Sequence, residues 1–384
     1  MKLARNVALL AIASFLADVS GEMLLAVLPF LLVAQGATGL AIGLVDGLAD
    51  AVGHVLKPVA GRLADRWGRR KPLIVSGYLV AAVSRFGIAA ATTWPVSLVF
   101  RASDRVGKGL RTAPRDALLA ESVPPAQRGR AFGLHRAADT AGAVVGVSLA
   151  LGALLVFGAT PASIVAAGAI VGLSTVIPLL FVREVDAHAT AKAEGDAPRS
   201  PRFRAFVLLA GLFALGEVSY MFFVLRVARS STEATAVALY LLFNLVYVAA
   251  AYPAGKLGDR IGKPRVLLAG WLLFALAAAL FIPAPSLPMT IAGFVLLGLS
   301  FAGFESMQRA FAADLAGARG RSTQLGWFHA TIGLSAVTGG IVAGLLWDRV
   351  GEWATFAWAA GLALVAAVAL SFVFVAKSRV SGTS

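Results

Sequence analysis

The stretch GRLADRWGRRK at residues 61–71 returns as GKLGDRIGKPR at residues 255–265, which begins 194 residues later. A second, shorter pair, RGR at residues 128–130 and RGR at residues 319–321, is separated by 191 residues. Half of the 384-residue chain is 192 residues. Both pairs therefore indicate that the chain consists of two repeated halves.

The sequence around these repeats is strongly apolar. Hydrophobic residues make up 59% of the chain and charged residues 14%, and the mean hydropathy is +0.82. Soluble domains contain about 45–50% apolar and about 25% charged residues, so this composition excludes a soluble fold, and it excludes disorder as well. The net charge of +14 would suggest nucleic acid in a soluble protein. In this chain the positions of the charges show whether they set the membrane topology or belong to a functional site.

A membrane-spanning helix needs about 20 mostly apolar residues, and that window predicts twelve helices. Their expected ranges are 7–34, 39–60, 72–92, 95–120, 131–157, 161–182, 204–228, 233–254, 264–283, 288–314, 321–346 and 353–376. The range 95–120 is too polar to be found by hydropathy alone, and is placed because Trp94 and Pro95 open it. We predict an all-α membrane protein of two six-helix bundles, residues 1–182 and 204–384, joined by the charged linker 183–203.

The first residues, MKLAR followed by an apolar run, resemble a signal peptide. The run continues to about Val33 without a clear cleavage site, and it contains Asp18 and Glu22. We therefore expect a retained first helix.

The Lys and Arg residues outside the helices lie mainly in the loops after the even-numbered helices and at the two termini. The opposite loops are nearly free of them, apart from Arg229 and Arg349. By the positive-inside rule both termini are expected in the cytoplasm. We predict a multi-pass protein of a prokaryotic inner membrane, monomeric, surrounded by the lipid bilayer and without a nucleic-acid partner.

The repeated stretch resembles a motif of the major facilitator superfamily, Gly-x-Leu-x-Asp-Arg-x-Gly-Arg-Arg, which joins helices 2 and 3. In that family the Asp matching Asp65 holds the two halves together in one state of the transport cycle. The resemblance thus implies a gating set: Gly61, Asp65, Arg66, Gly68, Arg69, Gly255, Asp259 and Arg260. Glycines at 61 and 68 would permit a tight turn, and a carboxylate at 65 would suit a helix N-terminus. The alternative is a basic loop that only sets topology.

Two further motifs of that family are matched in part. Residues 105–109, RVGKG, resemble its helix 4 motif Arg-x-x-Gln-Gly, with Lys108 in the Gln position. Gly133, Gly142 and Gly146 fit the glycine spacing of its antiporter motif in helix 5, where Val147 replaces a proline. The polar stretch 104–116 is similar to a group of prokaryotic exporters that includes nickel-resistance proteins. The resemblance implies a secondary transporter, near drug or metal-resistance exporters.

Ionisable side chains inside the bilayer cost about 2.5–3.5 kcal/mol each, so those at membrane depth are candidates for function. They are Asp18, Glu22, Asp46, Asp50, Arg101, Asp104, Arg105, Lys108, Arg111, Asp139, Glu217 and Glu305. Three roles remain open: proton coupling, recognition of a charged substrate, and structural ion pairs. A carboxyl group kept out of water holds its proton more readily. By depth, the candidates for proton coupling are Asp18, Glu22, Asp50 and Glu217.

Asp50 and His54 lie one turn apart in a helix and form the candidate pair for a transition metal, although no resident metal or other cofactor is predicted. The chain has no cysteine and lacks HExxH, GxSxG and P-loop sequences, so it is not expected to be an enzyme or to use ATP directly. The sequence predicts a secondary transporter that exports a small molecule in exchange for protons, with the proton gradient as energy source. The alternatives are export of a transition-metal ion and uptake of a small organic anion through the Arg-rich helix 95–120.

Overall fold

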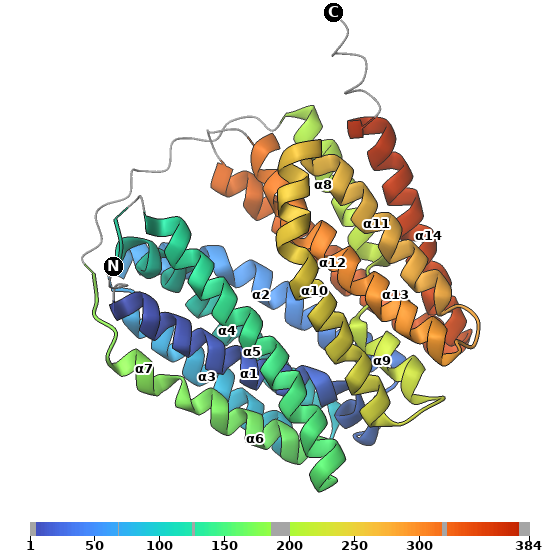
Figure 1. The fold of residues 1–384 in the computed structure, drawn as a ribbon, viewed down its shortest axis with the longest axis horizontal. Coiled ribbons are helices and arrows are strands. Elements are labelled where there is room, and N and C mark those ends of the chain that lie inside the picture. Colours follow the sequence, from blue (N-terminus) through green and yellow to red (C-terminus); the bar gives the residue numbers. More distant parts are fainter. Residues whose placement is uncertain (1–4, 68, 125–126, 186–199, 317–320, 376–384) are drawn as a thin grey trace, which may run out of the picture. The chain divides into compact units, whose positions relative to one another are not determined.

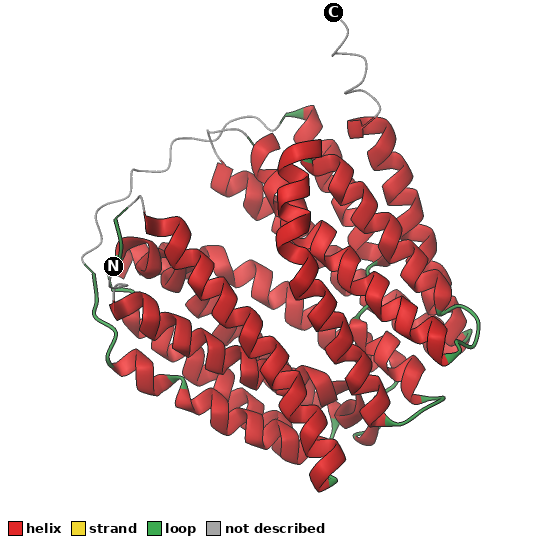
Figure 2. Ribbon diagram, in the orientation of Figure 1, coloured by secondary structure: helices red, strands yellow, loops and turns green. Residues whose placement is uncertain are grey.

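A computed structural model describes residues 5–67, 69–124, 127–185, 200–316 and 321–375. Every regular element in these ranges is a helix (Figure 2), which confirms the all-α prediction. The helices are α1 (Arg5–Ala34), α2 (Gly39–Trp67), α3 (Lys71–Ala90), α4 (Trp94–Glu121), α5 (Arg128–Phe157), α6 (Pro161–Ser174), α7 (Val176–Leu180), α8 (Pro201–Gly216), α9 (Tyr220–Ala228), α10 (Glu233–Ile261), α11 (Lys263–Leu280), α12 (Leu287–Leu315), α13 (Arg321–Arg349), α14 (Glu352–Leu370) and a π-helical turn (Ser371–Val375).

By length and composition, ten stretches of the described residues are suited to cross a membrane. The pairs α6 with α7 and α8 with α9 each count as one stretch. Helices α2 and α4 are long enough, with 29 and 28 residues, but they are not among the ten; α4 is rich in charged side chains. This outcome was expected for α4 and not for α2.

The helices group into two compact units (Figure 1). The first contains residues 1–37 and 48–191, and the second contains residues 38–47 and 192–384. Helix α2 therefore begins in the second unit and continues into the first. Residues 186–199 of the predicted linker lie outside the described residues, and the predicted domain boundaries stay a prediction.

The two units have different cores. The core of the second unit is aromatic: the rings of Phe213 and Trp271 stack with their centroids 4.7 Å apart, and Phe223 packs edge-on against Phe281 at 5.1 Å. The core of the first unit is aliphatic, with buried side chains such as Leu10, Ile74 and Leu118, and it also encloses charged side chains. The charged residues at membrane depth are thus concentrated in the first unit, as the sequence indicates.

The repeated motif ends a helix in each half, and its first glycine lies inside that helix rather than in a turn. Helix α2 continues to Trp67 and α10 to Ile261, so Gly61 and Gly255 both lie inside helices. In the second half the chain reverses at Gly262, whose positive φ of 96° favours glycine. Gly68 and the side chain of Asp65 lie outside the described residues, so the role of Asp65 as a latch stays a prediction.

The seventh of the twelve predicted spans, Pro201–Ala228, is broken at its middle. Helix α8 ends at Gly216, and Glu217 has φ −74° and ψ 82°, outside the helical region. The backbone carbonyl of Leu215 accepts a hydrogen bond from the indole Nε1 of Trp358 (3.0 Å) on α14. Ser219 caps α9, with its hydroxyl accepting from the amide of Met221 (3.2 Å). Glu217 therefore lies at a helix break and not, as expected, inside a continuous helix.

The start of α2 is held within the second unit by α13. The carboxylate of Asp348 accepts hydrogen bonds from the first amides of α2, those of Gly39 (2.7 Å) and Leu40 (2.9 Å). A few residues further along, the backbones approach so closely that a Cβ on Gly340 would lie 2.5 Å from the carbonyl oxygen of Gly43. Asp348 thus supplies a side-chain cap to a helix N-terminus from another helix.

We expect Asp348→Ala to weaken this end of α2 by about 1 kcal/mol, because two first-turn amides lose their acceptor. Hydrogen exchange measured by mass spectrometry should show faster exchange in peptides that cover residues 39–47. Asp314→Ala is the matched control, since Asp314 is an exposed acid that pairs with Lys263 elsewhere in the same unit. Equal exchange in both variants would contradict the capping role.

Candidate functional site

A cluster of polar and charged side chains lies inside the first unit, on α1, α3, α4 and α5. Its members are Ser14, Asp18, Ser20, Glu22, Tyr78, Arg85, Arg101, Asp104, Arg111, Arg115, His135 and Asp139, and we call this set the polar cluster. The cluster has two layers, one around Asp104 and one around Tyr78, and an acidic edge on α1 and α5.

The layer around Asp104 joins α3 to α4. Oδ1 of Asp104 lies 3.0 Å from Nε of Arg85, and Oδ2 lies 3.1 Å from Nη1 of Arg101. The carboxylate side chain is only 3% exposed. Each carboxylate oxygen therefore accepts a charge-assisted hydrogen bond from a different arginine inside the bundle.

Arg85 also connects this layer to α1. Its Nη1 donates to the backbone carbonyl of Ala17 (3.2 Å) and to the hydroxyl of Ser20 (2.5 Å). The Ser20 hydroxyl in turn donates to the carbonyl of Gly168 on α6. One buried guanidinium thus positions α1, α3 and α4, and through Ser20 it reaches α6.

The second layer is built on Tyr78 of α3. The guanidinium of Arg111 lies over the Tyr78 ring, 4.0 Å from its centroid, a favourable cation–π geometry. The hydroxyls of Tyr78 and Ser14 are 3.3 Å apart. Arg115 donates to the Ser14 hydroxyl (2.8 Å) and pairs with Asp116 at 2.9 Å. Two arginines of α4 therefore contact α1 and α3 in this layer.

The acidic edge lies where α1 meets α5. A Cβ built on Gly142 of α5 would lie 3.1 Å from Cβ of Asp18, and one on Gly146 would lie 3.0 Å from Cβ of Glu22. The two glycines thus allow α5 to approach the face of α1 that carries both acids. One turn before Gly142, Asp139 acts electrostatically on Asp18, and its Oδ2 lies 3.5 Å from Nδ1 of His135.

Positive side chains of α4 act electrostatically on this acidic edge. Lys108, Arg111 and Arg115 all interact electrostatically with Asp18. Lys108 is exposed, whereas Arg111 is buried. The arrangement places carboxyl groups of α1 and α5 within the field of several cations, where a change in the charge of one group affects the others.

The second unit contributes fewer polar groups at membrane depth. The hydroxyl of Tyr247 donates to Oε2 of Glu305 (2.5 Å), and Oε1 of Glu305 lies 3.0 Å from Arg309. Tyr247 ends a row of stacked rings on α10 that includes Tyr240 and Phe243. Glu217 lies at the break of the seventh span, just before Tyr220, whose ring stacks on Tyr240 at 4.9 Å.

The structure brings together only part of the predicted site. Asp18, Glu22, Arg101, Asp104, Arg111 and Asp139 belong to the polar cluster, with Arg105 and Lys108 on the same helix α4. Asp46 lies in the segment of α2 that belongs to the second unit. Glu217 and Glu305 belong to the second unit as well, on other elements. The side chains of Asp50 and His54 lie outside the described residues. Among the described side chains, no group of three or more His, Asp or Glu residues could hold a metal ion.

The predicted gating residues that can be described are on the surface. Arg66 and Arg69 are exposed in the first unit, and Asp259 and Arg260 are exposed at the end of α10. A Cβ on Gly255 would meet no atom within 4 Å. These positions are accessible, and the gating function of the set stays a prediction.

Sequence reasoning missed four polar residues that contact the predicted charges. They are Ser14, Ser20, Tyr78 and Tyr247. Helical spacing could have found two of them, because Ser14 is one turn before Asp18 and Tyr78 is two turns before Arg85. The other two are uncharged residues whose importance depends on a partner from another helix.

Two units of membrane-spanning helices, one of them enclosing a charged cluster, define the class of multi-pass membrane transport proteins. The family model of the Major Facilitator Superfamily matches residues 10–227 and 206–384. The chain belongs to this superfamily. It is a membrane transporter and not an enzyme.

Similar proteins agree with this assignment. An MFS-type transporter of Methanocaldococcus jannaschii is 34% identical over 382 residues, which cover 97% of this chain and 96% of that protein. The multidrug resistance protein MdtH of Aeromonas hydrophila is 30% identical over 327 residues, covering 82% and 79%. The crystal structure of the nucleoside transporter NupG has a TM-score of 0.77 at 18% identity, covering 96% of this chain and 99% of that one, a similarity of fold.

Proposed function

We propose that this transporter exports a small molecule in exchange for protons, and that the carboxyl groups of Asp18 and Asp139 carry the proton. The proposal is supported by the position of these two acids at the close α1–α5 interface, where the charge of Asp139 acts on Asp18. When two carboxyl groups lie close together and away from water, the state in which they share a proton is favoured over the state in which both are charged. Such a pair can take up a proton on one side of the membrane and release it on the other.

The cations of α4 give this pair a means of coupling. Arg115 and Lys108 act electrostatically on Asp139, as they do on Asp18. When a proton leaves the acidic pair, its negative charge strengthens the attraction to α4, and when a proton binds, that attraction weakens. Proton binding is thereby linked to the packing of α1, α4 and α5.

The direction of transport is the second part of the proposal. MdtH proteins, about 30% identical to this chain, are multidrug resistance proteins, and this supports export. The glycines at 142 and 146, which bring α5 against α1, also fit the spacing of the antiporter motif. We further propose that the protein acts as a monomer in a prokaryotic inner membrane, with both termini in the cytoplasm, as the distribution of Lys and Arg favours.

A second candidate, uptake of a small organic anion, is favoured by a separate observation. Arg85, Arg101 and Arg111 are all buried, and among the described acids Asp104 is the one that pairs with two of them. Guanidinium groups bind carboxylates and phosphates in a planar, bidentate way. An anionic substrate would therefore find its binding groups in the layers around Asp104 and Tyr78.

The test begins with a thermal-stabilisation screen of the purified protein against nickel ions, ethidium as an organic cation and p-aminohippurate as an organic anion. The compound that stabilises the protein is then followed in proteoliposomes with an imposed pH gradient. We expect its transport to move protons in the opposite direction. Asp18→Asn and Asp139→Asn should each lower proton-driven transport by at least about tenfold while leaving ligand binding in place.

Asp314→Asn is the matched control, because Asp314 is an acid of the second unit whose side chain is 55% exposed and pairs with Lys263, away from the polar cluster. It should transport as the unmodified protein does. Undiminished proton flux in both Asp18→Asn and Asp139→Asn would contradict the coupling role. Stabilisation by p-aminohippurate alone, with protons moving in the same direction as the anion, would favour the second candidate.

A further inference from the structure

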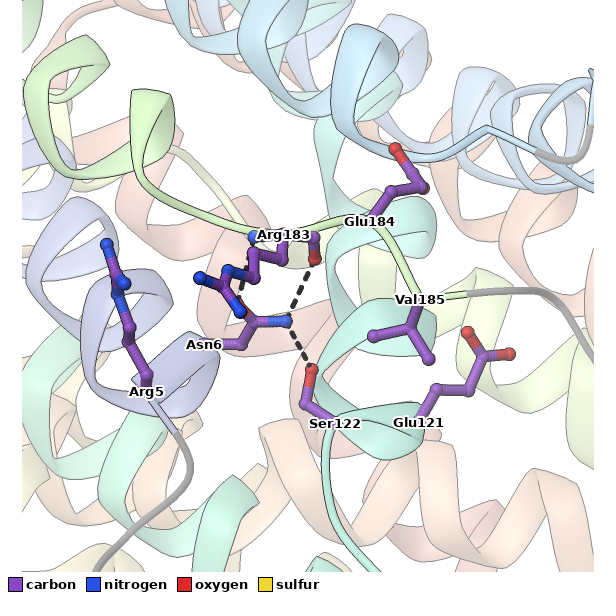
Figure 3. Close-up of a pocket in the computed structure, with 7 residues that line it drawn as sticks. All are labelled: Arg5, Asn6, Glu121, Ser122, Arg183, Glu184 and Val185. Carbon is purple, nitrogen blue, oxygen red and sulfur yellow. Dashed lines mark hydrogen bonds between the residues drawn. The ribbon is translucent and has the colours of Figure 1, made fainter.

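The first unit has a pocket of about 410 Å³ at the end that carries the start of α1 and the end of α4. It is separate in composition from the polar cluster, with which it shares no residue. Figure 3 shows its lining: Arg5, Asn6, Glu121, Ser122, Arg183, Glu184 and Val185. We call it the Arg5–Arg183 pocket.

Asn6 fixes the shape of this pocket. Its Nδ2 donates to the Ser122 hydroxyl (3.1 Å) and to the carbonyl of Arg183 (2.9 Å), and its Oδ1 accepts from the Arg183 amide (3.0 Å). These bonds, drawn as dashed lines in Figure 3, join the first turn of α1 to the end of α4 and to the segment after α7. Arg183 is therefore held beside Arg5 by its backbone, and its side chain is left to line the pocket.

Both acids of the pocket already have an ion-pair or hydrogen-bond partner. Glu184 accepts hydrogen bonds from the amides of Arg70 (2.6 Å) and Lys71 (3.0 Å) at the start of α3, where the helix dipole favours a carboxylate. Glu121 forms an ion pair with the buried side chain of Arg70. Glu121 is thus compensated by an ion pair and Glu184 by backbone hydrogen bonds, without help from Arg5 or Arg183.

The two arginines of the lining have no such compensation. Within the ranges that the structure describes, neither the Arg5 nor the Arg183 guanidinium forms a hydrogen bond or an ion pair, and both side chains are exposed. The pocket therefore presents two guanidinium groups with an excess of positive charge. A guanidinium matches the geometry of a phosphate group better than that of any neutral ligand, because it can donate two parallel hydrogen bonds.

We propose that the Arg5–Arg183 pocket binds a phosphate group, such as that of an anionic phospholipid headgroup. The first membrane span begins at Arg5 and the sixth ends at Leu180, so the pocket lies at the depth where a span meets the aqueous phase. Basic pockets between membrane helices at this depth bind anionic headgroups. Free phosphate has the same chemistry, and the experiment below separates the two sources.

The experiment uses the purified full-length protein in neutral detergent, with bound lipid counted by native mass spectrometry and stability followed by thermal unfolding. Phosphatidylglycerol, phosphatidylcholine and inorganic phosphate are added in separate arms. We expect phosphatidylglycerol to bind and to raise the melting temperature more than phosphatidylcholine does. In Arg5→Gln/Arg183→Gln its affinity should fall about twenty-five-fold, because each arginine contributes a factor of about five.

The matched control is Arg202→Gln/Arg204→Gln, which removes two exposed arginines at the start of α8 and changes the net charge equally. It should keep the affinity for phosphatidylglycerol. Stabilisation by inorganic phosphate, lost in the Arg5/Arg183 variant, would support the phosphate site and assign it to the free anion. The proposal is overturned if the unmodified protein responds equally to both lipids and not to phosphate, or if the control loses as much affinity as the variant.

If the double glutamine variant fails to fold, Arg5→Lys/Arg183→Lys takes its place. It keeps both charges and loses the bidentate geometry, so its affinity for phosphatidylglycerol should fall by a smaller factor. An affinity equal to that of the unmodified protein would overturn the assignment of the two guanidinium groups. The comparison of phosphatidylglycerol with phosphatidylcholine on the unmodified protein tests the preference for an anionic headgroup without any variant.

Discussion

Replacing Asp104 with asparagine is expected to destabilise the protein by about 3–5 kcal/mol, the cost of breaking a buried ion pair by removing one partner. Asp104 is the shared acceptor of Arg85 and Arg101, and its side chain is 3% exposed. Without its negative charge, two buried guanidinium groups face each other with their counter-charge removed. Thermal unfolding in detergent should therefore show a large drop in melting temperature, or the variant should fail to yield a monodisperse protein.

Two further variants show whether this effect belongs to the ion pair. Asp116→Asn removes a half-exposed acid from the same helix, and its cost should stay below about 1 kcal/mol because exposed pairs contribute little. Arg85→Gln combined with Asp104→Asn removes one charge of each sign and should be less destabilised than the sum of the single variants. A cost for Asp104→Asn no larger than that for Asp116→Asn would contradict the structural role given to Asp104.

Gly142→Ala and Gly146→Ala are each expected to destabilise the first unit by about 1–3 kcal/mol through overpacking. A Cβ on Gly142 would lie 2.5 Å from the carbonyl oxygen of Phe15, and one on Gly146 would overlap the carbonyl of Val19. Because backbone cannot move aside as a side chain can, α5 would have to withdraw from α1. Asp139 would then move away from Asp18, so proton-driven transport should fall together with stability.

Gly152→Ala on the same helix is the matched control. A Cβ there meets no atom within 4 Å, and alanine in a helix interior is favoured over glycine by about 0.5–1 kcal/mol. The control is therefore expected to raise the melting temperature slightly, opposite in sign to the other two. Equal stabilisation by all three alanines would show that α1 and α5 do not pack as described.

The fold could be predicted from the sequence because two independent features, the repeated motif and the apolar windows, indicate the same arrangement of helices. The two copies of the motif at residues 61–71 and 255–265 agree on the length of the repeat, and apolar windows place most spans within a few residues. Helix α2 shows where this reasoning stops. Its charged final turns, from about residue 61 to Trp67, read as a loop, although a helix can project from the bilayer with its polar end in water.

The candidate site could be predicted only in part. Depth in a span identifies Asp18, Asp104 and Asp139, because a charge inside the bilayer is costly wherever its partner lies. It does not identify the partner. Arg85 is 19 residues from Asp104 in sequence, and Asp18 is more than one hundred residues from Asp139, so both contacts depend on which helices are neighbours in the bundle. Ser20 and Tyr247 carry no charge and give no comparable signal.

The broken seventh span has a mechanical consequence. A continuous helix resists bending because each bend must lengthen backbone hydrogen bonds. After Glu217 this helix has already exchanged such bonds for others: Trp358 donates to the carbonyl of Leu215, and the Ser219 hydroxyl accepts from the amide of Met221 at the start of α9. The span is therefore compliant at one fixed point and stiff on either side of it. When one end of this span is pushed, α8 and α9 are therefore expected to rotate relative to each other about Glu217, while each helix keeps its shape.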